Sequence, residues 1–306
     1  MKAGIAFKSM IANALEYSGQ IDNILLAKNR SRYLILMYHR VIPSTEAPAG
    51  LQPGMYVEPK TFEMHVNYLK NHFQVVSFQD LMKDTTSFSL QKNSKPFCIL
   101  TFDDGWFDFY KYAYPLLSHE KMPATVFLPT KYINTNDIFW TDILAYLIVM
   151  IWRGVDISKA PHTLKSDLAK KIVVEKGTEE SKVENAISIL KQHDHVRIFS
   201  ILNEISKTFN IDFPSTGRAF LNWNEVREMF HSGLITFGSH TEGHKILVHL
   251  SDDEIIDELN RSKRKLIMEN VVDSSFIPFF FPNGNHNDRI VKLISESGYH
   301  ASVTTE

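Results

Sequence analysis

Lys95-Pro-Phe-Cys-Ile-Leu-Thr-Phe-Asp103-Asp104-Gly105 is a short apolar run that ends in two aspartates and a glycine. The apolar residues predict a buried strand that begins after Pro96 and ends at Phe102. Asp103 and Asp104 therefore stand at the C-terminal end of this strand. In parallel barrels the catalytic residues come from the C-terminal ends of the strands, so this stretch marks the functional edge of the predicted sheet.

A second apolar run, Leu234 to Ser239, predicts another strand, and two histidines follow it. His240 and His244 stand four positions apart, a spacing that lets both rings converge on one ion from a helical turn or a tight loop. Asp-Asp-Gly alone is an ordinary turn, and an isolated histidine pair is more often solvated surface. Together, one carboxylate and two imidazoles match an open catalytic zinc site, in which bound water has a pKa of about 7. The two motifs together indicate a metal-dependent hydrolase.

Strand and helix patterns alternate along the chain and predict a mainly parallel sheet of the α/β class. The expected strands cover residues 33–38, 74–77, 97–102, 124–128, 234–239, 276–281 and 301–304. The expected helices cover residues 59–71, 107–120, 251–269 and 288–298. Residues 1–30 predict an N-terminal helical segment. We expect a single barrel domain over residues 31–306, interrupted by a charged helical insertion at about 135–220.

Both motifs resemble those of the polysaccharide deacetylases of carbohydrate esterase family 4. Thr101-Phe-Asp-Asp-Gly105 matches the first family motif, T-F-D-D-G, and His240-Thr-Glu-Gly-His244 matches the second, H-[ST]-x-x-H. The resemblance covers roughly residues 31–134 and 220–306, and it implies a distorted (β/α)7 barrel that removes acetyl groups from N-acetylated sugars. It also implies that Asp103 is the general base and that Asp104, His240 and His244 bind the metal. Zn2+ fits these ligands, and Ni2+ or Co2+ also suit imidazole-rich sites.

A general acid is needed to protonate the departing amine, and histidine is the side chain best suited to this near neutral pH. Many members of the family carry this histidine in an L-x-H motif near the C-terminus, which this sequence lacks. Instead, the apolar run that begins at Leu34 ends in His39, as in the circularly permuted deacetylases that act on poly-N-acetylglucosamine. The resemblance makes His39 the expected general acid. The alternative is that Tyr38 and His39 only close a barrel strand.

The third family motif, R-x-P-[YF]-G, is altered in this chain. Phe279-Phe-Phe-Pro282-Asn283-Gly284 places phenylalanine where the family arginine orients the catalytic base, and Arg40 and Arg289 are candidates to replace it. Pro282 and Gly284 restrict the backbone of this loop, and the Asn283 N–H is a candidate donor to the oxyanion. A simple strand-ending Asn-Gly turn is the alternative.

Composition excludes several classes of function. A formal net charge of −2 over 306 residues predicts no nucleic-acid partner and no attraction to an anionic membrane. Cys98 is the only cysteine and is expected in the core. The apolar run at residues 143–152 is too short to cross a bilayer, and no N-terminal stretch reads as a convincing signal peptide. A cytoplasmic location is therefore expected, with membrane attachment through a helix in residues 9–28 as the alternative.

Three functions remain open on the sequence. The leading one is a metal-dependent deacetylase of a glycan that contains N-acetylhexosamine. The second is a metal-dependent hydrolase of another amide, such as a cyclic amide, or of an ester. The third is an inactive glycan-binding relic, which the missing motif arginine would explain. The sequence leaves the particular sugar and the oligomeric state undetermined.

Overall fold

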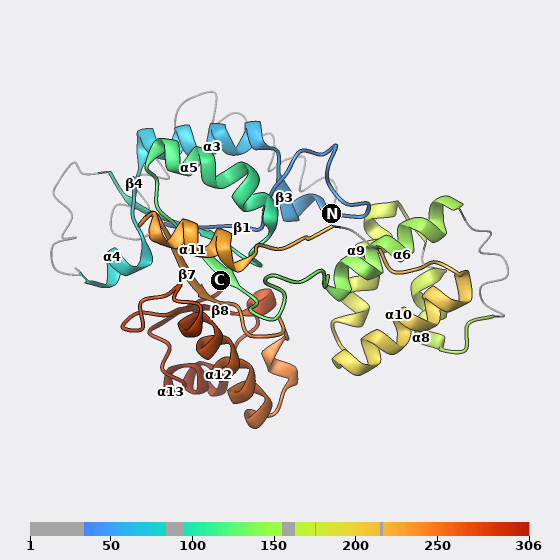
Figure 1. The fold of residues 1–306 in the computed structure, drawn as a ribbon. Coiled ribbons are helices and arrows are strands. Elements are labelled where there is room, and N and C mark those ends of the chain that lie inside the picture. Colours follow the sequence, from blue (N-terminus) through green and yellow to red (C-terminus); the bar gives the residue numbers. More distant parts are fainter. Residues whose placement is uncertain (1–33, 84–94, 155–162, 175, 215–216, 306) are drawn as a thin grey trace.

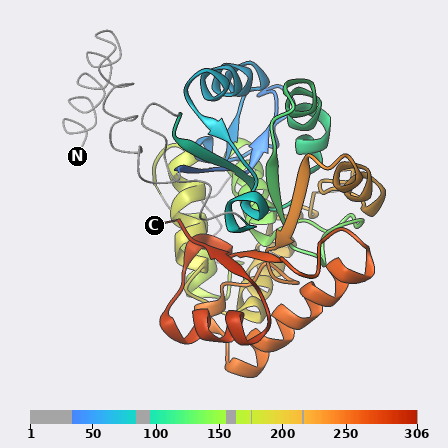
Figure 2. The same ribbon diagram turned by 90° about the vertical axis from the view of Figure 1, so that its left-hand side faces the viewer.

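A curved parallel sheet forms the centre of the fold. The computed structural model describes residues 34–83, 95–154, 163–174, 176–214 and 217–305. Within them, seven parallel strands form one sheet, and the main path runs β1-β5-β6-β7-β8-β9, with β4 also paired to β5. These strands are β1 (Leu34–Tyr38), β4 (Gln74–Val75), β5 (Phe97–Phe102), β6 (Ala124–Leu128), β7 (Ile235–Ser239), β8 (Pro278–Phe280) and β9 (Ala301–Val303). The sheet curls into a partial barrel with helices around it (Figure 2). The predicted α/β barrel and each of its predicted strands are confirmed.

Helices between the strands cover the outside of the sheet (Figure 1). They are α3 (Pro59–His72), α4 (Phe78–Lys83), α5 (Tyr114–Glu120), α11 (Trp223–His231), α12 (Asp252–Met268) and α13 (Asp288–Glu296). Local sequence fixes several of their starts. Asn222 with Glu225 and Ser251 with Glu254 form capping boxes at α11 and α12, which satisfy backbone N–H groups that a helix start leaves free. A π-helical turn, η2 (Phe109–Ala113), precedes α5, so the helix expected from residue 107 begins in irregular form.

The strands are apolar because both of their faces are covered. Every residue of β5 and β6 is buried, as expected for parallel strands enclosed by helices. Leu100, Phe102 and Phe237 belong to the main core cluster, which includes residues of the surrounding helices, such as Leu259 of α12. A smaller cluster contains residues from alternate positions of the same strands; its members include Ile99, Phe127, Phe280 and Val303. Cys98 is fully buried in β5.

Within the described residues, four further helices form a lobe beside the barrel (Figure 1). They are α6 (Trp140–Gly154), α8 (Asp167–Val173), α9 (Glu179–Leu190) and α10 (His195–Phe209), and they enclose a hydrophobic cluster of their own. The lobe also contacts the loop that precedes η1 (Pro53–Met55). Gly50 of this loop lies so close to α6 that an added Cβ would be 3.0 Å from the Cβ of Ala145. The start of α6 lines the same cavity as Asp103 and Asp104, so this helix lies at the C-terminal edge of the sheet.

Two predictions concern membranes and the N-terminus. Among the described helices, none combines the length and the apolar character that crossing a membrane requires. The predicted N-terminal helical segment, residues 1–30, lies outside the described residues.

Candidate metal centre and active site

The turn after β5 places both aspartates at the edge of the sheet. The Asp103 N–H donates to the carbonyl oxygen of Tyr38 at the end of β1, so the strand ladder continues to the first aspartate. Asp104 then adopts a left-handed backbone conformation with φ 72°, which aspartate tolerates better than most residues. Gly105 follows with φ 62°, and a Cβ there would lie 2.6 Å from Leu128 on β6. Both the backbone conformation and the close Leu128 side chain favour glycine at the end of this motif.

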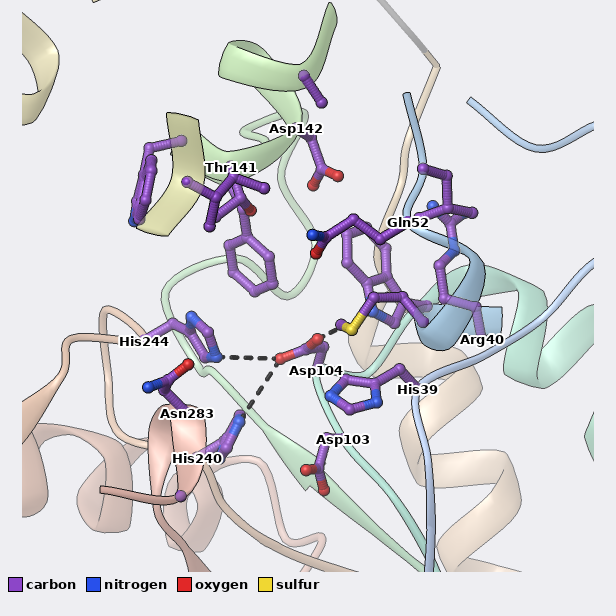
Figure 3. Close-up of a pocket in the computed structure, with 18 of the residues that line it drawn as sticks. His39, Arg40, Gln52, Asp103, Asp104, Thr141, Asp142, His240, His244 and Asn283 are labelled. Atoms are coloured by element: carbon purple, nitrogen blue, oxygen red, sulfur yellow. Dashed lines mark hydrogen bonds and ion pairs between the residues drawn. The ribbon is translucent and has the colours of Figure 1, made fainter. Parts of the chain in front are cut away.

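His240 and His244 converge on Asp104. Their Nε2 atoms lie 3.5 Å and 3.2 Å from Oδ1 of the carboxylate (Figure 3). One ligand-type atom from each of the three residues lies within 4.8 Å of the other two. Oδ1 is buried and makes no hydrogen bond within the described part of the chain. An orphaned carboxylate oxygen that faces two imidazole nitrogens fits a divalent ion of the zinc type.

Neighbouring groups fix the His240 ring. Nδ1 lies 2.8 Å from the backbone carbonyl oxygen of Phe280, which can only accept, so Nδ1 carries the proton and Nε2 presents its lone pair to Asp104. Burial, with a smaller contribution from the adjacent His244, lowers the pKa of His240 to about 3, so the ring is neutral. A neutral imidazole is the form that binds metals.

Asp104 is held in its ionised form. Burial alone would raise its pKa, but the imidazoles of His244, His39 and His240 outweigh burial and hold the pKa of Asp104 well below its ordinary range. The indole N–H of Trp106 donates to Oδ2 at 3.1 Å. One oxygen is therefore satisfied by protein, and the other faces the two rings.

Glu258 on α12 holds the loop between the two histidines. This buried carboxylate accepts the Gly243 N–H at 2.7 Å and lies 2.8 Å from Nζ of Lys245. Thr241 and His244 adopt left-handed backbone conformations, with φ 64° and 54°. His240 and His244 therefore stand on a tight loop and not on a helical turn, the other arrangement that their spacing allows.

Asp103 lies beside this group and is almost completely buried. Its Oδ1 has no hydrogen-bond partner among the described residues. Burial raises the pKa of Asp103 well above its ordinary value, and the charge of Asp104 adds to the effect. The two arginines that were candidates to replace the motif arginine, Arg40 and Arg289, form ion pairs with other carboxylates. Arg289 pairs with Asp252 at the surface, and Nε of Arg40 lies 2.7 Å from Asp108.

His39 follows β1 and lines the same cavity as the two aspartates. Burial lowers the pKa of His39, although the charge of Asp104 acts in the opposite direction. The structure thus brings the predicted general acid to the predicted base and metal ligands, with His39 close to Asp104 (Figure 3).

The Pro282-Asn283-Gly284 loop forms another wall of the cavity as a single 3-10 turn. Asn283 has φ 62°, and its side-chain oxygen accepts a hydrogen bond from Lys191, just after α9. Gly284 has φ 73°, and a Cβ there would meet the Thr305 hydroxyl at 2.2 Å. Through the contact with Lys191, this turn joins the barrel to the helical lobe.

The cavity has a volume of about 260 Å³ and lies between the barrel edge and the lobe. Sequence reasoning missed several polar residues that line it, among them Gln52, Asp142 and Lys191. Asp142 stands in the first turn of α6, two residues after Trp140 and three after Phe139. Phe139 stacks on His244, with ring centroids 4.5 Å apart. An acidic residue beside these aromatics was the available signal for this wall.

Several known proteins resemble this chain in sequence or in fold. The sequence profile of the polysaccharide deacetylase family matches residues 91–175 and 171–302. A stretch of 103 residues is 35% identical to YxkH of Bacillus subtilis (strain 168), whose name assigns it to the polysaccharide deacetylases. The match covers 33% of this chain and 33% of that relative, so it spans about a third of the relative's length.

Solved structures share the fold. IcaB from Ammonifex degensii superimposes with a TM-score of 0.54 over 89% of this chain and 83% of its own, at 17% identity. The Streptococcus pyogenes deacetylase PplD, solved in complex with acetate, has a TM-score of 0.52 over 90% of this chain and 83% of its own, at 18% identity. The polysaccharide deacetylase BC0361 from Bacillus cereus also has a TM-score of 0.52, over 90% of this chain and 58% of its own, at 18% identity.

The family profile extends over most of the chain and includes both aspartates, both histidines and the Pro-Asn-Gly loop. At identities of 17–18%, the solved structures add a common fold. The predicted resemblance is therefore confirmed, and this chain belongs to the polysaccharide deacetylase family.

Proposed function

We propose that this protein is a metal-dependent N-deacetylase of a glycan that contains N-acetylhexosamine. One observation carries the proposal: Nε2 of His240 and of His244 converge on Oδ1 of Asp104, next to the buried carboxylate of Asp103. Family membership supports the reaction class. In this reaction, water and the acetamido group of the sugar yield acetate and a free amine.

Asp104, His240 and His244 would hold the ion. Zn2+ suits one carboxylate and two imidazoles, and Ni2+ or Co2+ are compatible with the same donors. When bound, the ion polarises the acetamide carbonyl and acidifies water. The neutral state of His240 and the ionised state of Asp104 favour binding, because neither ligand has to lose a proton first.

Asp103 is proposed as the general base. Its carboxylate lies beside Asp104, and burial makes it a stronger base by raising its pKa. In the proposed role, it takes a proton from the attacking water. Arg40 and Arg289 pair with other carboxylates, so neither is proposed as the partner of this base.

His39 is proposed as the general acid. Its ring lines the cavity, and burial lowers its pKa, which makes the protonated ring a stronger acid towards the departing amine. Pro282, Asn283 and Gly284 would shape the opposite wall of the site. The left-handed conformation of Asn283 holds this turn, and its backbone N–H is the proposed donor to the oxyanion.

Acetate release from N-acetylglucosamine oligomers tests the proposal. Metal-stripped and zinc-reconstituted protein would be compared, with Asp103→Asn as the base-deleted variant. Asp137→Asn makes the same change at an exposed site and serves as the matched control. We expect release only after reconstitution, no change in Asp137→Asn, and a loss of at least about 100-fold in Asp103→Asn, the size typical of general base catalysis.

Other outcomes would favour the other two functions. Zinc-dependent hydrolysis of simple amides or esters, without action on the oligomers, would indicate a different substrate class. Oligomer binding without turnover, in protein with one bound zinc per chain, would indicate a binding relic. Equal activity of Asp103→Asn and wild-type protein would contradict the role given to the base.

A further inference from the structure

The helical lobe supplies one wall of the active-site cavity, and Asp142 is its acidic residue. Asp142 stands in the first turn of α6 and lines the cavity together with Asp103 and Asp104. Figure 3 shows its carboxylate pointing into the space above Asp104, on the side away from Asp103 and opposite Gln52. It lies outside the group of three residues that could share one ion.

One oxygen of the Asp142 carboxylate lacks a hydrogen-bond partner in the described part of the chain. This atom, Oδ2, is buried. Burial raises the pKa of Asp142 to about 6, against the opposing charge of Arg40. A buried acceptor without a donor costs stability, so its persistence in a cavity indicates a partner that comes from outside the chain.

A role in the helix alone does not account for this geometry. Negative charge in the first turn stabilises a helix through the helix dipole, but an exposed carboxylate provides the same effect. Exposed Asp137 shows that this segment can carry its acidic residues in solvent. Asp142 instead faces the reaction site.

The surroundings of Asp142 favour a neutral donor as its ligand. Arg40 and Lys191 line the same cavity, so an ammonium group would meet two cations as well as the carboxylate. A sugar hydroxyl donates a hydrogen bond without bringing charge. At about 260 Å³, the cavity is smaller than the roughly 300–1,000 Å³ of pockets that enclose drug-sized ligands, and it suits a single sugar ring.

We propose that Asp142 is a specificity-determining residue that accepts hydrogen bonds from hydroxyl groups of the sugar ring whose acetamido group lies at Asp104. The inference rests on the proposed function. It assigns sugar recognition to the helical lobe, whereas the barrel edge carries the bond cleavage. Removing the carboxylate should therefore weaken sugar binding and leave the reaction centre intact.

Binding to metal-stripped protein tests this without turnover. The affinity for an N-acetylglucosamine tetramer would be measured by calorimetry for wild-type protein, Asp142→Ala, Asp142→Asn and the control Asp137→Asn. We expect Kd to rise at least about 10-fold in Asp142→Ala, as for a lost hydrogen bond to a charged group. Asp142→Asn keeps one acceptor oxygen, so its Kd should lie between those of the wild type and Asp142→Ala. The Kd of Asp137→Asn should equal that of the wild type.

A second measurement separates recognition from folding and chemistry. Zinc-loaded Asp142→Ala should show a raised KM for the tetramer and wild-type rates on 4-nitrophenyl acetate, which has no sugar hydroxyls. A variant that failed to fold would lose both activities. Equal tetramer Kd values for Asp142→Ala and wild type, or no binding by the wild type, would overturn the proposal.

The two proposals can fail separately. Binding that depends on Asp142, in a protein that releases no acetate with zinc, would remove the deacetylase function and keep the role of Asp142. Acetate release by a protein whose tetramer affinity is unchanged in Asp142→Ala would keep the deacetylase function and remove the role of Asp142.

Discussion

The carbonyl oxygen of Phe280 on β8 lies 2.8 Å from Nδ1 of His240, the residue that follows β7. The third motif has lost its arginine, yet its backbone still orients a proposed metal ligand. Because this contact uses a main-chain oxygen, it does not require an arginine side chain in the motif. The altered motif thus retains a role at the site that no side-chain comparison reveals.

Removal of a proposed ligand should abolish tight metal binding. We expect His240→Ala to weaken zinc affinity by more than the roughly 10- to 100-fold seen when an outer-shell partner of a ligand is lost. Zinc titration of metal-stripped protein measures the change. His231→Ala, an exposed histidine on α11, should bind zinc as the wild type does. Equal affinity of the two variants would exclude His240 as a ligand.

Glu258 should support the metal site through the histidine loop. Glu258→Ala leaves the Gly243 N–H without its acceptor, so we expect about 1–3 kcal/mol lower stability. We also expect zinc affinity to fall about 10-fold, because the loop carries His244. Chemical denaturation and zinc titration measure the two effects. Asp253→Asn, an exposed change on the same helix, should alter neither, and unchanged zinc affinity in Glu258→Ala would show that the loop holds without this carboxylate.

Gly238 should tolerate no side chain. A Cβ there would lie 2.7 Å from the Phe127 ring and 2.7 Å from the Pro278 carbonyl oxygen, where β6 and β8 flank β7. Gly238→Ala should therefore cost about 1–3 kcal/mol of unfolding free energy through overpacking. Gly54→Ala, with no atom within 4 Å of the added carbon, is the control for thermal or denaturant unfolding. Equal stability of the two variants would mean that the strands move apart easily.

Cys98 should be unreactive in the folded protein. Burial raises its thiol pKa from 9.0 to about 12, so almost no thiolate exists at pH 8. Reaction with a thiol reagent should therefore follow unfolding in denaturant. The same shift removes stability as pH rises from about 9 towards 12, because the unfolded chain loses this proton first. Rapid labelling at pH 8 under native conditions would contradict the buried position.

The parallel sheet was predictable because both faces of its strands are buried. Apolar runs such as that of β5 stand out in the sequence, and the ligand-type residues that follow β5 and β7 must meet at one edge of the sheet. Helix starts were readable where capping residues are local, as at Ser251. These features depend on neighbours in the sequence.

Features that depend on how the helical lobe contacts the barrel were not predictable. Asp142 of α6 and Lys191 at the end of α9 both line the cavity, because the lobe packs against the sheet edge. The acidic residue near Phe139 and Trp140 is a local signal, but it does not say which part of the barrel the lobe contacts. The pairing of Arg40 with Asp108 likewise joins residues that the sequence does not relate. Arg40 therefore looked free to serve Asp103, although it is already bound.

The convergence of Asp104 with His240 and His244 also bears on how the folded chain is held together. The ligands follow β5 and β7, which lie on either side of β6 and are separated in the sequence by the whole helical lobe. An ion at this point would cross-link the middle of the sheet and bind the native chain in preference to the unfolded one. At a free concentration 1,000 times its Kd, it would add about 4.1 kcal/mol to the unfolding free energy. The reaction centre would then also stabilise the fold as a cross-link, and metal depletion would lower the melting temperature as well as the activity.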